Sequence, residues 1–138
     1  MSIKLKYNGF IINKINYEYK SNLESQQKEY YLDFMLDDIS VAVSEEDAII
    51  TLSGHATCLN EKNDDKSKYR TLSLSVNYFY DIKNRNHMDS QKEIQEIVKN
   101  YGVNNSIILY QELVKHITSL DSADPIKSYD FEFPGSLR

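Results

Sequence analysis

The residues best suited to catalysis or metal binding in this sequence are three histidines and one cysteine. His55, His87 and His116 lie in separate segments, and none has a second histidine or a carboxylate at a recognised metal-ligand spacing. His55 and Cys58 stand three positions apart in a strand-like segment, so their side chains point to opposite faces and do not form a nucleophile–base pair. We therefore expect no catalytic residue, no metal site and no cofactor, and we interpret Cys58 as a small buried side chain.

Acidic clusters are the other candidates for a metal site. They are Asp37 with Asp38, Glu45 to Asp47, and Asp64 with Asp65. Such carboxylates could hold a cation only if folding brought them together, and none lies in a recognisable cation-binding loop. We interpret these clusters as solvated turns.

The amino-acid composition limits the classes of function that this protein can have. The chain has 138 residues, with 16 Lys and Arg against 21 Asp and Glu. This balance argues against nucleic-acid binding as the main function, because such binding needs a clustered basic face, although local basic patches remain open. Its N-terminus lacks the pattern of a signal peptide, and no run approaches the ~20 apolar residues that span a bilayer. We expect a cytoplasmic protein without a membrane span, formed by one domain over residues 1–138 with mobile ends at 1–8 and 134–138.

Alternation of apolar and polar residues predicts four strands in meander-like succession. The second is interrupted at Asp37 and Asp38, where the apolar positions change parity as they do at a β-bulge. The polar stretches 21–28 and 60–68 are predicted loops. The four predicted strands cover residues 11–20, 29–43, 48–58 and 71–82.

Helical periodicity follows the predicted strands. Asp89 or Ser90 can cap a first helix, which Gly102 ends in a left-handed conformation. A second helix begins at Asn104 or Asn105, and the segment after Pro125 is predicted to be an extended accessory strand or a draped segment. The apolar residues of the second helix are assigned to helix packing or to an oligomer contact: Ile107, Ile108, Leu109, Tyr110, Leu113, Val114 and Ile117.

The chain is rich in tyrosine, with 11 Tyr and no Trp. Parity places these rings on both faces of the predicted sheet, so they cannot all enter one core. Half-exposed tyrosines favour a surface that binds other chains, although tyrosine is also common in ordinary strands. The candidate contact residues are Tyr17, Tyr19, Tyr31, Met35, Tyr78 and Tyr80.

Three segments resemble the SecB family of export chaperones. The first strand, INKINYEY, resembles the alternating first strand of that family, and YGVNNSIILYQELVKHIT resembles its signature turn and helix. The ending DPIKSYDFEFP is similar to the segment after that helix. The family's proline at the helix start is absent here, where Tyr110 or its neighbour stands, and Val103 and Asn104 replace its Cys-Pro pair.

This resemblance implies an α+β fold, with a four-stranded antiparallel sheet and two main helices packed on one side. It also implies a homo-oligomer, either a dimer or a dimer of dimers, and a function as an ATP-independent holdase for unfolded or preprotein clients. The chain stops at Arg138 without the family's last helix and tail, which weakens the expectation of delivery to the SecA motor.

Two other functions remain open on the sequence. The same fold could serve as an oligomeric adaptor for one dedicated partner, for example as a chaperone associated with a toxin–antitoxin pair. A small enzyme or ligand carrier, with a pocket between the sheet and the second helix, is the weakest alternative because no acid–base pair can be named.

Overall fold

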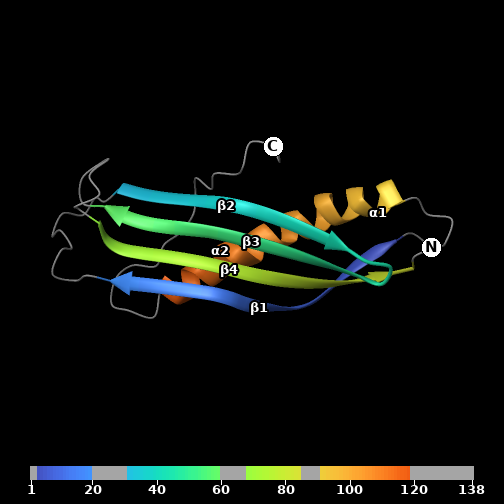
Figure 1. The fold of residues 1–138 in the computed structure, drawn as a ribbon, viewed down its shortest axis with the longest axis horizontal. Coiled ribbons are helices and arrows are strands. Elements are labelled where there is room, and N and C mark those ends of the chain that lie inside the picture. Colours follow the sequence, from blue (N-terminus) through green and yellow to red (C-terminus); the bar gives the residue numbers. More distant parts are fainter. Residues whose placement is uncertain (1–2, 20–30, 60–67, 85–90, 119–138) are drawn as a thin grey trace.

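A four-stranded antiparallel sheet forms one layer of the molecule, and one long helix forms the other (Figure 1). The computed structural model describes residues 3–19, 31–59, 68–84 and 91–118. The architecture is α+β, as the sequence predicts. Its strands are β1 Lys4–Tyr19, β2 Tyr31–Val43, β3 Asp47–Leu59 and β4 Lys68–Lys83.

The order of strands in the sheet is β1-β4-β3-β2. The predicted meander holds for β2, β3 and β4, but it is wrong for β1, which pairs with β4 and not with β2. This arrangement is a Greek key in reverse chain order. The consecutive strands β2, β3 and β4 are neighbours, and β1 lies beside β4, the last of the three. Among the described strands, β1 and β2 are therefore the two edge strands.

Alternation explains why one face of the sheet is buried. Along β3 and β4 every second residue is buried, and the intervening positions are mostly polar. Polar pairs cover the outer face, including a hydrogen bond from Thr51 Oγ1 to Asn77 Oδ1 of 2.7 Å. A register shift between Leu36 and Asp38 confirms the predicted bulge in β2.

Strand β1 is longer than the sequence indicates. It begins at Lys4, not at Ile11, and residues 4–7, which we expected to be mobile, pair with residues 80–83 of β4. A register shift between Tyr7 and Phe10 interrupts the alternation, and Gly9 lies there with φ of 105°. Only glycine adopts this backbone conformation without strain, so the bulge hides the strand from a period-two search.

The prediction of two helices is wrong, because a single helix runs without a break. It comprises α1 Gln91–Ile97, a π-helical segment η3 Val98–Val103 and α2 Asn104–Thr118. Gly102 does not end a helix, and its φ is not positive. A Cβ atom on Gly102 would lie 2.6 Å from Ile50 Cδ1, so this glycine instead allows the helix to approach the sheet closely.

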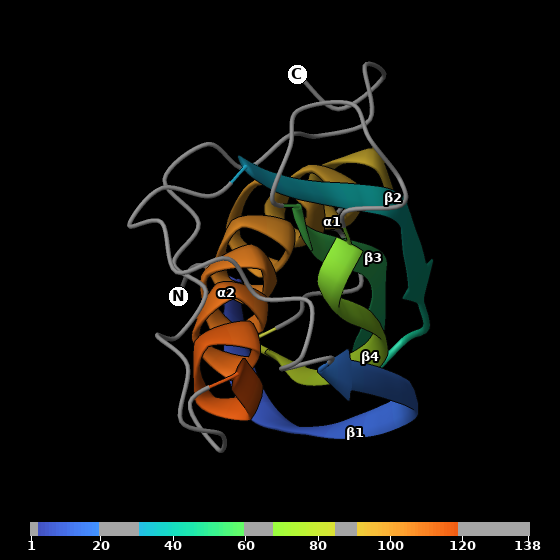
Figure 2. The ribbon, with the colours of Figure 1, turned by 90° about the vertical axis from the view of Figure 1, so that its left-hand side faces the viewer.

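The sheet curls around the helix, with β1 and β2 at its two margins (Figure 2). The core lies between the helix and the buried faces of β3 and β4. The predicted loops 21–28 and most of 60–68, and the segment after Pro125, lie outside the described residues.

Candidate functional site

The inner face of β1 is apolar along its whole length. Pairing with β4 defines this face, because its residues lie opposite buried positions: Tyr7 pairs with Tyr80, and Phe10 pairs with Tyr78. On β3 and β4 such residues are covered by the helix. On β1 the inner-face residues from Tyr7 to Ile15 are exposed, because β1 lies at the margin of the curled sheet, whereas Leu5, Tyr17 and Tyr19 are partly buried against the core.

Four neighbouring side chains of this face are exposed to solvent, and we call them the β1 apolar strip: Tyr7, Phe10, Ile12 and Ile15. Phe10 is 48% exposed, although its ring centroid lies 6.1 Å from that of the buried Tyr78. Large apolar side chains that gather at one place on a surface indicate a contact with another molecule.

A groove separates the β1 apolar strip from α2. Tyr7, Phe10 and Tyr78 line its sheet side, and its volume is about 210 Å³. Its helix side is formed by the partly buried Leu109 and Leu113 and by two polar residues, Glu112 and His116. The groove is thus apolar along its floor and acidic at one wall.

A second hollow lies beside the first residues of β1. Its volume is about 490 Å³, and its lining comprises Ile3, Lys4 and Leu5 from the strand side and Ile97 and Tyr101 from the helix side. Tyr101 is 75% exposed and belongs to η3. We call this space the amino-end hollow and the previous one the central groove.

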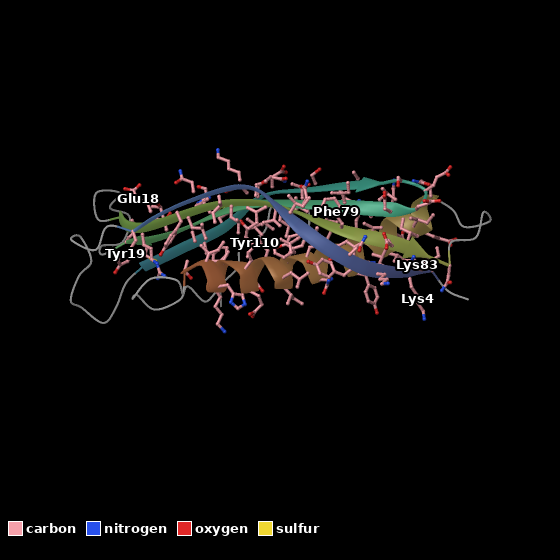
Figure 3. The ribbon with its side chains drawn as sticks, turned by 90° about the horizontal axis from the view of Figure 1, so that it is seen from below. Lys4, Glu18, Tyr19, Phe79, Lys83 and Tyr110 are labelled. Carbon is pink, nitrogen blue, oxygen red and sulfur yellow. The ribbon has the colours of Figure 1, made fainter. Side chains whose placement is uncertain are left out.

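The backbone of β1 offers a second kind of contact. Within the described part of the chain β1 pairs with β4 alone, so alternate N–H and C=O groups of residues 3–15 point outward from the sheet. Such an edge is a template for adding another strand. Figure 3 views the molecule from the side on which β1 lies, with β1 in front of the other strands.

Most tyrosines of the helix–sheet interface hold the core together. The Tyr110 hydroxyl donates to the Leu74 carbonyl oxygen at 2.9 Å, and Tyr110 lies between sheet and helix in Figure 3. The Tyr80 hydroxyl lies 2.8 Å from Ser106 Oγ, and Asn105 Nδ2 donates to it at 2.9 Å. The predicted exposure of Tyr80 is therefore wrong, because its hydroxyl is satisfied inside the protein.

Tyr78 is also buried, with 1% of its surface exposed, so its predicted exposure is wrong as well. Among the described residues its hydroxyl is the buried side-chain group without a hydrogen-bond partner. Burial raises the pKa of Tyr78 well above the ordinary tyrosine value, and the nearby Tyr110 adds to that effect. Tyr78 contributes its ring to the floor of the central groove.

Tyr17 and Tyr19 surround a buried arginine instead of standing free on the surface. Arg70 Nε donates to the Tyr17 hydroxyl at 2.8 Å, and its guanidinium lies 5.9 Å from the Tyr17 ring centroid and 5.8 Å from that of Tyr19. Arg70 also donates to the carbonyl oxygen of Thr118, the last residue of α2. These contacts join β1, β4 and the end of the helix.

The remaining predicted contact residues lie on the opposite edge strand. Met35 of β2 is half-buried, and the side chain of Tyr31 lies outside the described residues. Neither is close to the β1 apolar strip in the sheet, because β4 and β3 separate β2 from β1. The structure therefore does not bring the six candidate residues together into one surface.

The apolar residues of α2 divide into three groups. The buried ones pack against the sheet, namely Ile107, Tyr110, Val114 and Ile117. Leu109 and Leu113 are half-buried and line the central groove. Ile108 is 59% exposed and points away from the sheet.

Among the described residues, the histidines, Cys58 and the carboxylates do not gather into one cluster. His55 Nδ1 lies 2.8 Å from Asp37 Oδ2, with both side chains partly exposed. Cys58 is buried, as predicted. Within residues 3–19, 31–59, 68–84 and 91–118, no three ligand-type side chains converge on a metal position, and no helix is long and apolar enough to cross a membrane.

Sequence reasoning missed the exposed residues of β1. The signal was present in the run Phe10, Ile11 and Ile12, where three large apolar residues follow one another. Consecutive apolar residues in a strand cannot share one face, so at least one of them must lie on the outer side. Ile11 does so, opposite Asn77, and it is 58% exposed.

Comparison with known proteins places this geometry in a structural context. No model of a protein family and no curated protein sequence matches the chain. Among solved structures, the SecB-like chaperone Rv1957 of Mycobacterium tuberculosis, in complex with a ChAD peptide from the Rv1956 HigA1 antitoxin, superposes with a TM-score of 0.62. The match covers 90% of this chain and 88% of that one, at 13% identity.

The fold is SecB-like. At 13% identity this similarity concerns the fold, and the function must be argued from the residues of this chain. A protein of unknown function from Streptococcus agalactiae superposes with a TM-score of 0.40 at 10% identity, over 93% of this chain and 98% of that one, which is too low to add to the argument.

Proposed function

We propose that this SecB-like protein is an ATP-independent holdase, which binds unfolded or preprotein clients along β1. The observation that carries the proposal is the β1 apolar strip beside the outer edge of β1, which pairs with no other strand among the described residues. The two features together suit an extended chain, because it can bury side chains in the central groove while its backbone pairs with β1.

Burial supplies the affinity in this proposal. Apolar surface removed from water contributes about 25 cal/mol per Å². Backbone pairing adds hydrogen bonds that do not depend on the client sequence, so binding is broad. This function requires no catalytic residue and no cofactor, and we propose that the protein is not an enzyme.

A role in the cytoplasm, before membrane translocation, is the export-linked form of the proposal. A client chain that is bound in extended form on an edge strand cannot fold. A translocation channel requires its substrate in such an unfolded state.

The second candidate is a chaperone or adaptor for one dedicated partner, such as the antitoxin of a toxin–antitoxin pair. It is favoured by the solved complex of the SecB-like Rv1957 with an antitoxin peptide. On this alternative the same groove takes one sequence with high affinity. Recovery of one stoichiometric partner, without affinity for unfolded chains in general, would favour the adaptor.

Suppression of aggregation tests the holdase. The purified protein, in stoichiometric amount and without ATP, is expected to lower light scattering from a chemically unfolded substrate on dilution. Phe10→Ser is expected to weaken this protection because it removes an apolar side chain from the central groove. Ile11→Ser is the matched control, since Ile11 is similarly exposed on the same strand but faces the other side.

Each outcome of this experiment has a defined meaning. Absence of protection by the wild-type protein would reject the holdase. Protection that Phe10→Ser and Ile11→Ser reduce equally would keep a holdase but remove the central groove from its binding surface.

A further inference from the structure

The amino-end hollow and the central groove follow one another along the same face of β1. The first adjoins residues 3–5 of the strand, and the second adjoins Tyr7 and Phe10. Leu5 and Tyr7 lie on the inner face of the strand, opposite Ile82 and Tyr80. A single extended segment that runs beside β1 therefore passes both spaces.

Strand geometry sets the distance between two residues that fill these spaces. The centres of the two contact regions are separated by about four residues of strand, which corresponds to roughly 13 Å at ~3.3 Å per residue. Side chains of an added strand must be an even number of positions apart to point to the same face. Anchors at positions i and i+4 satisfy both conditions.

Charge distinguishes the two ends of the surface along which such a segment would lie beside β1. Lys4 lines the amino-end hollow and pairs in register with Lys83, and both are exposed at the same end of the molecule (Figure 3). Like charges directly opposite one another are unfavourable, and a bound carboxylate relieves their repulsion. At the central groove the exposed charged residue of the wall is Glu112, beside His116.

We propose that β1 selects extended polypeptide segments with two large apolar residues at i and i+4 and an acidic residue next to the anchor that enters the amino-end hollow. This inference rests on the proposed function, because it names the class of client segment that the β1 site takes. The apolar anchors fill the two spaces, and the carboxylate, which points to the outer face as Lys4 does, lies beside Lys4 and offsets its repulsion with Lys83.

A series of synthetic peptides tests the spacing. The peptides carry the same residues, with two leucines placed two, four or six positions apart and one glutamate beside the first leucine. Fluorescence anisotropy with the full chain is expected to show the tightest binding for the spacing of four. Moving the glutamate to the far leucine is expected to weaken binding several-fold.

Variants of the protein assign each anchor to its space. Tyr101→Ser in the amino-end hollow and Phe10→Ser in the central groove are each expected to lower the affinity roughly tenfold, as expected for loss of one apolar contact. Ile11→Ser on the outer face is the matched control and is expected to leave the affinity unchanged.

Lys4→Glu is expected to reverse the preference for the position of the glutamate, whereas Lys14→Glu, opposite Ser75 on the outer face, is expected to preserve it.

The outcomes separate this inference from the holdase itself. Equal affinities for all three spacings, together with suppression of aggregation, would overturn the two-anchor frame and leave the holdase standing. Failure to bind any peptide, together with failure to suppress aggregation, would reject the holdase as well. If light scattering shows a dimer that Phe10→Ser dissociates while no peptide binds, a second copy of the chain occupies β1 and the inference is overturned.

Discussion

Tyr78 and Tyr110 are buried on the same side of the sheet but differ in the surroundings of their hydroxyl groups. Tyr110 donates to the Leu74 carbonyl oxygen, whereas the Tyr78 hydroxyl is without a partner among the described residues. A buried hydroxyl that forms no hydrogen bond lowers stability, because it has lost its contact with water. The two tyrosines thus form a natural pair for comparison.

Removing each hydroxyl is expected to have different effects on the free energy of unfolding. Tyr110→Phe should lower it by about 1 kcal/mol, because the hydrogen bond to Leu74 is lost. Tyr78→Phe should leave it unchanged or raise it by up to ~1 kcal/mol, since the desolvation penalty disappears. Urea unfolding measures both values, and equal losses in the two variants would contradict this account.

Stability is expected to fall at alkaline pH. Burial raises the pKa of both Tyr78 and Tyr110 in the folded state, with Tyr110 next to Tyr78 and the Asp37 charge next to Tyr110 as further causes. An unfolded tyrosine ionises near pH ~10, while the folded protein retains these protons, so the unfolded state is favoured as pH rises above about 10. The contribution of the two buried tyrosines to the free energy of unfolding is fully present below that pH.

Urea midpoints measured from pH 8 to pH 11 test this expectation. The midpoint should be constant below about pH 10 and decline above it. Tyr78→Phe should show a smaller decline than the wild type because one of the two raised groups is absent. A decline that begins near neutral pH, or one of the same size in Tyr78→Phe, would contradict the assignment.

At the scale of elements, two glycines control how closely the layers approach. A Cβ atom on Gly54 would lie 2.7 Å from the Met35 carbonyl oxygen, which is backbone of β2, and 2.8 Å from the Tyr110 hydroxyl. A Cβ atom on Gly102 would meet Ile50 Cδ1, the end of a flexible side chain. The first obstacle cannot move without shifting a strand, whereas the second can turn aside.

Substitution of each glycine by alanine is therefore expected to separate the two cases. Gly54→Ala should lower the free energy of unfolding by about 1–3 kcal/mol through overpacking. Gly102→Ala should cost less, because alanine gains up to ~1 kcal/mol in helix propensity over glycine. Urea unfolding provides the comparison, and a larger loss in Gly102→Ala would contradict the expectation that the Ile50 side chain can turn aside.

Several features of the elements were predictable from the sequence alone. Strands β3 and β4 and the bulge after Leu36 follow from strict alternation, which is a local property of the chain. The continuous helix and the early start of β1 did not follow. A glycine can end a helix or allow a close approach, and at Gly102 the proximity of Ile50 decides between the two. A glycine can likewise end a strand or form a bulge within it, and at Gly9 the pairing of β1 with β4 decides.

At the scale of the whole molecule, the assembly of copies depends on which exposed apolar surface they share. We propose that a homo-oligomer forms through the outer face of the helix, where Ile108 is exposed on the side away from the sheet. A contact through this face leaves β1 accessible to clients. An oligomer that used β1 would compete with them.

Light scattering of the purified protein is expected to show a dimer or a dimer of dimers. Ile108→Glu is expected to shift it to a monomer, since a buried charge without a partner opposes association. Ile11→Glu, an equally exposed position on the outer face of the sheet, serves as the control and should not change the mass. A wild-type monomer would reject the assembly, and dissociation by Ile11→Glu alone would move the interface to the sheet.

The sequence by itself determined the α+β class, the antiparallel strands and the apolar stripe of the helix, because these depend on periodicity along the chain. It also indicated a surplus of aromatic residues beyond the needs of one core. Only the tertiary structure decided which aromatic residues are exposed. The order β1-β4-β3-β2 buries Tyr78 and Tyr80 under the helix and leaves Phe10 at the margin, since exposure depends on what lies above a strand and not on its own pattern.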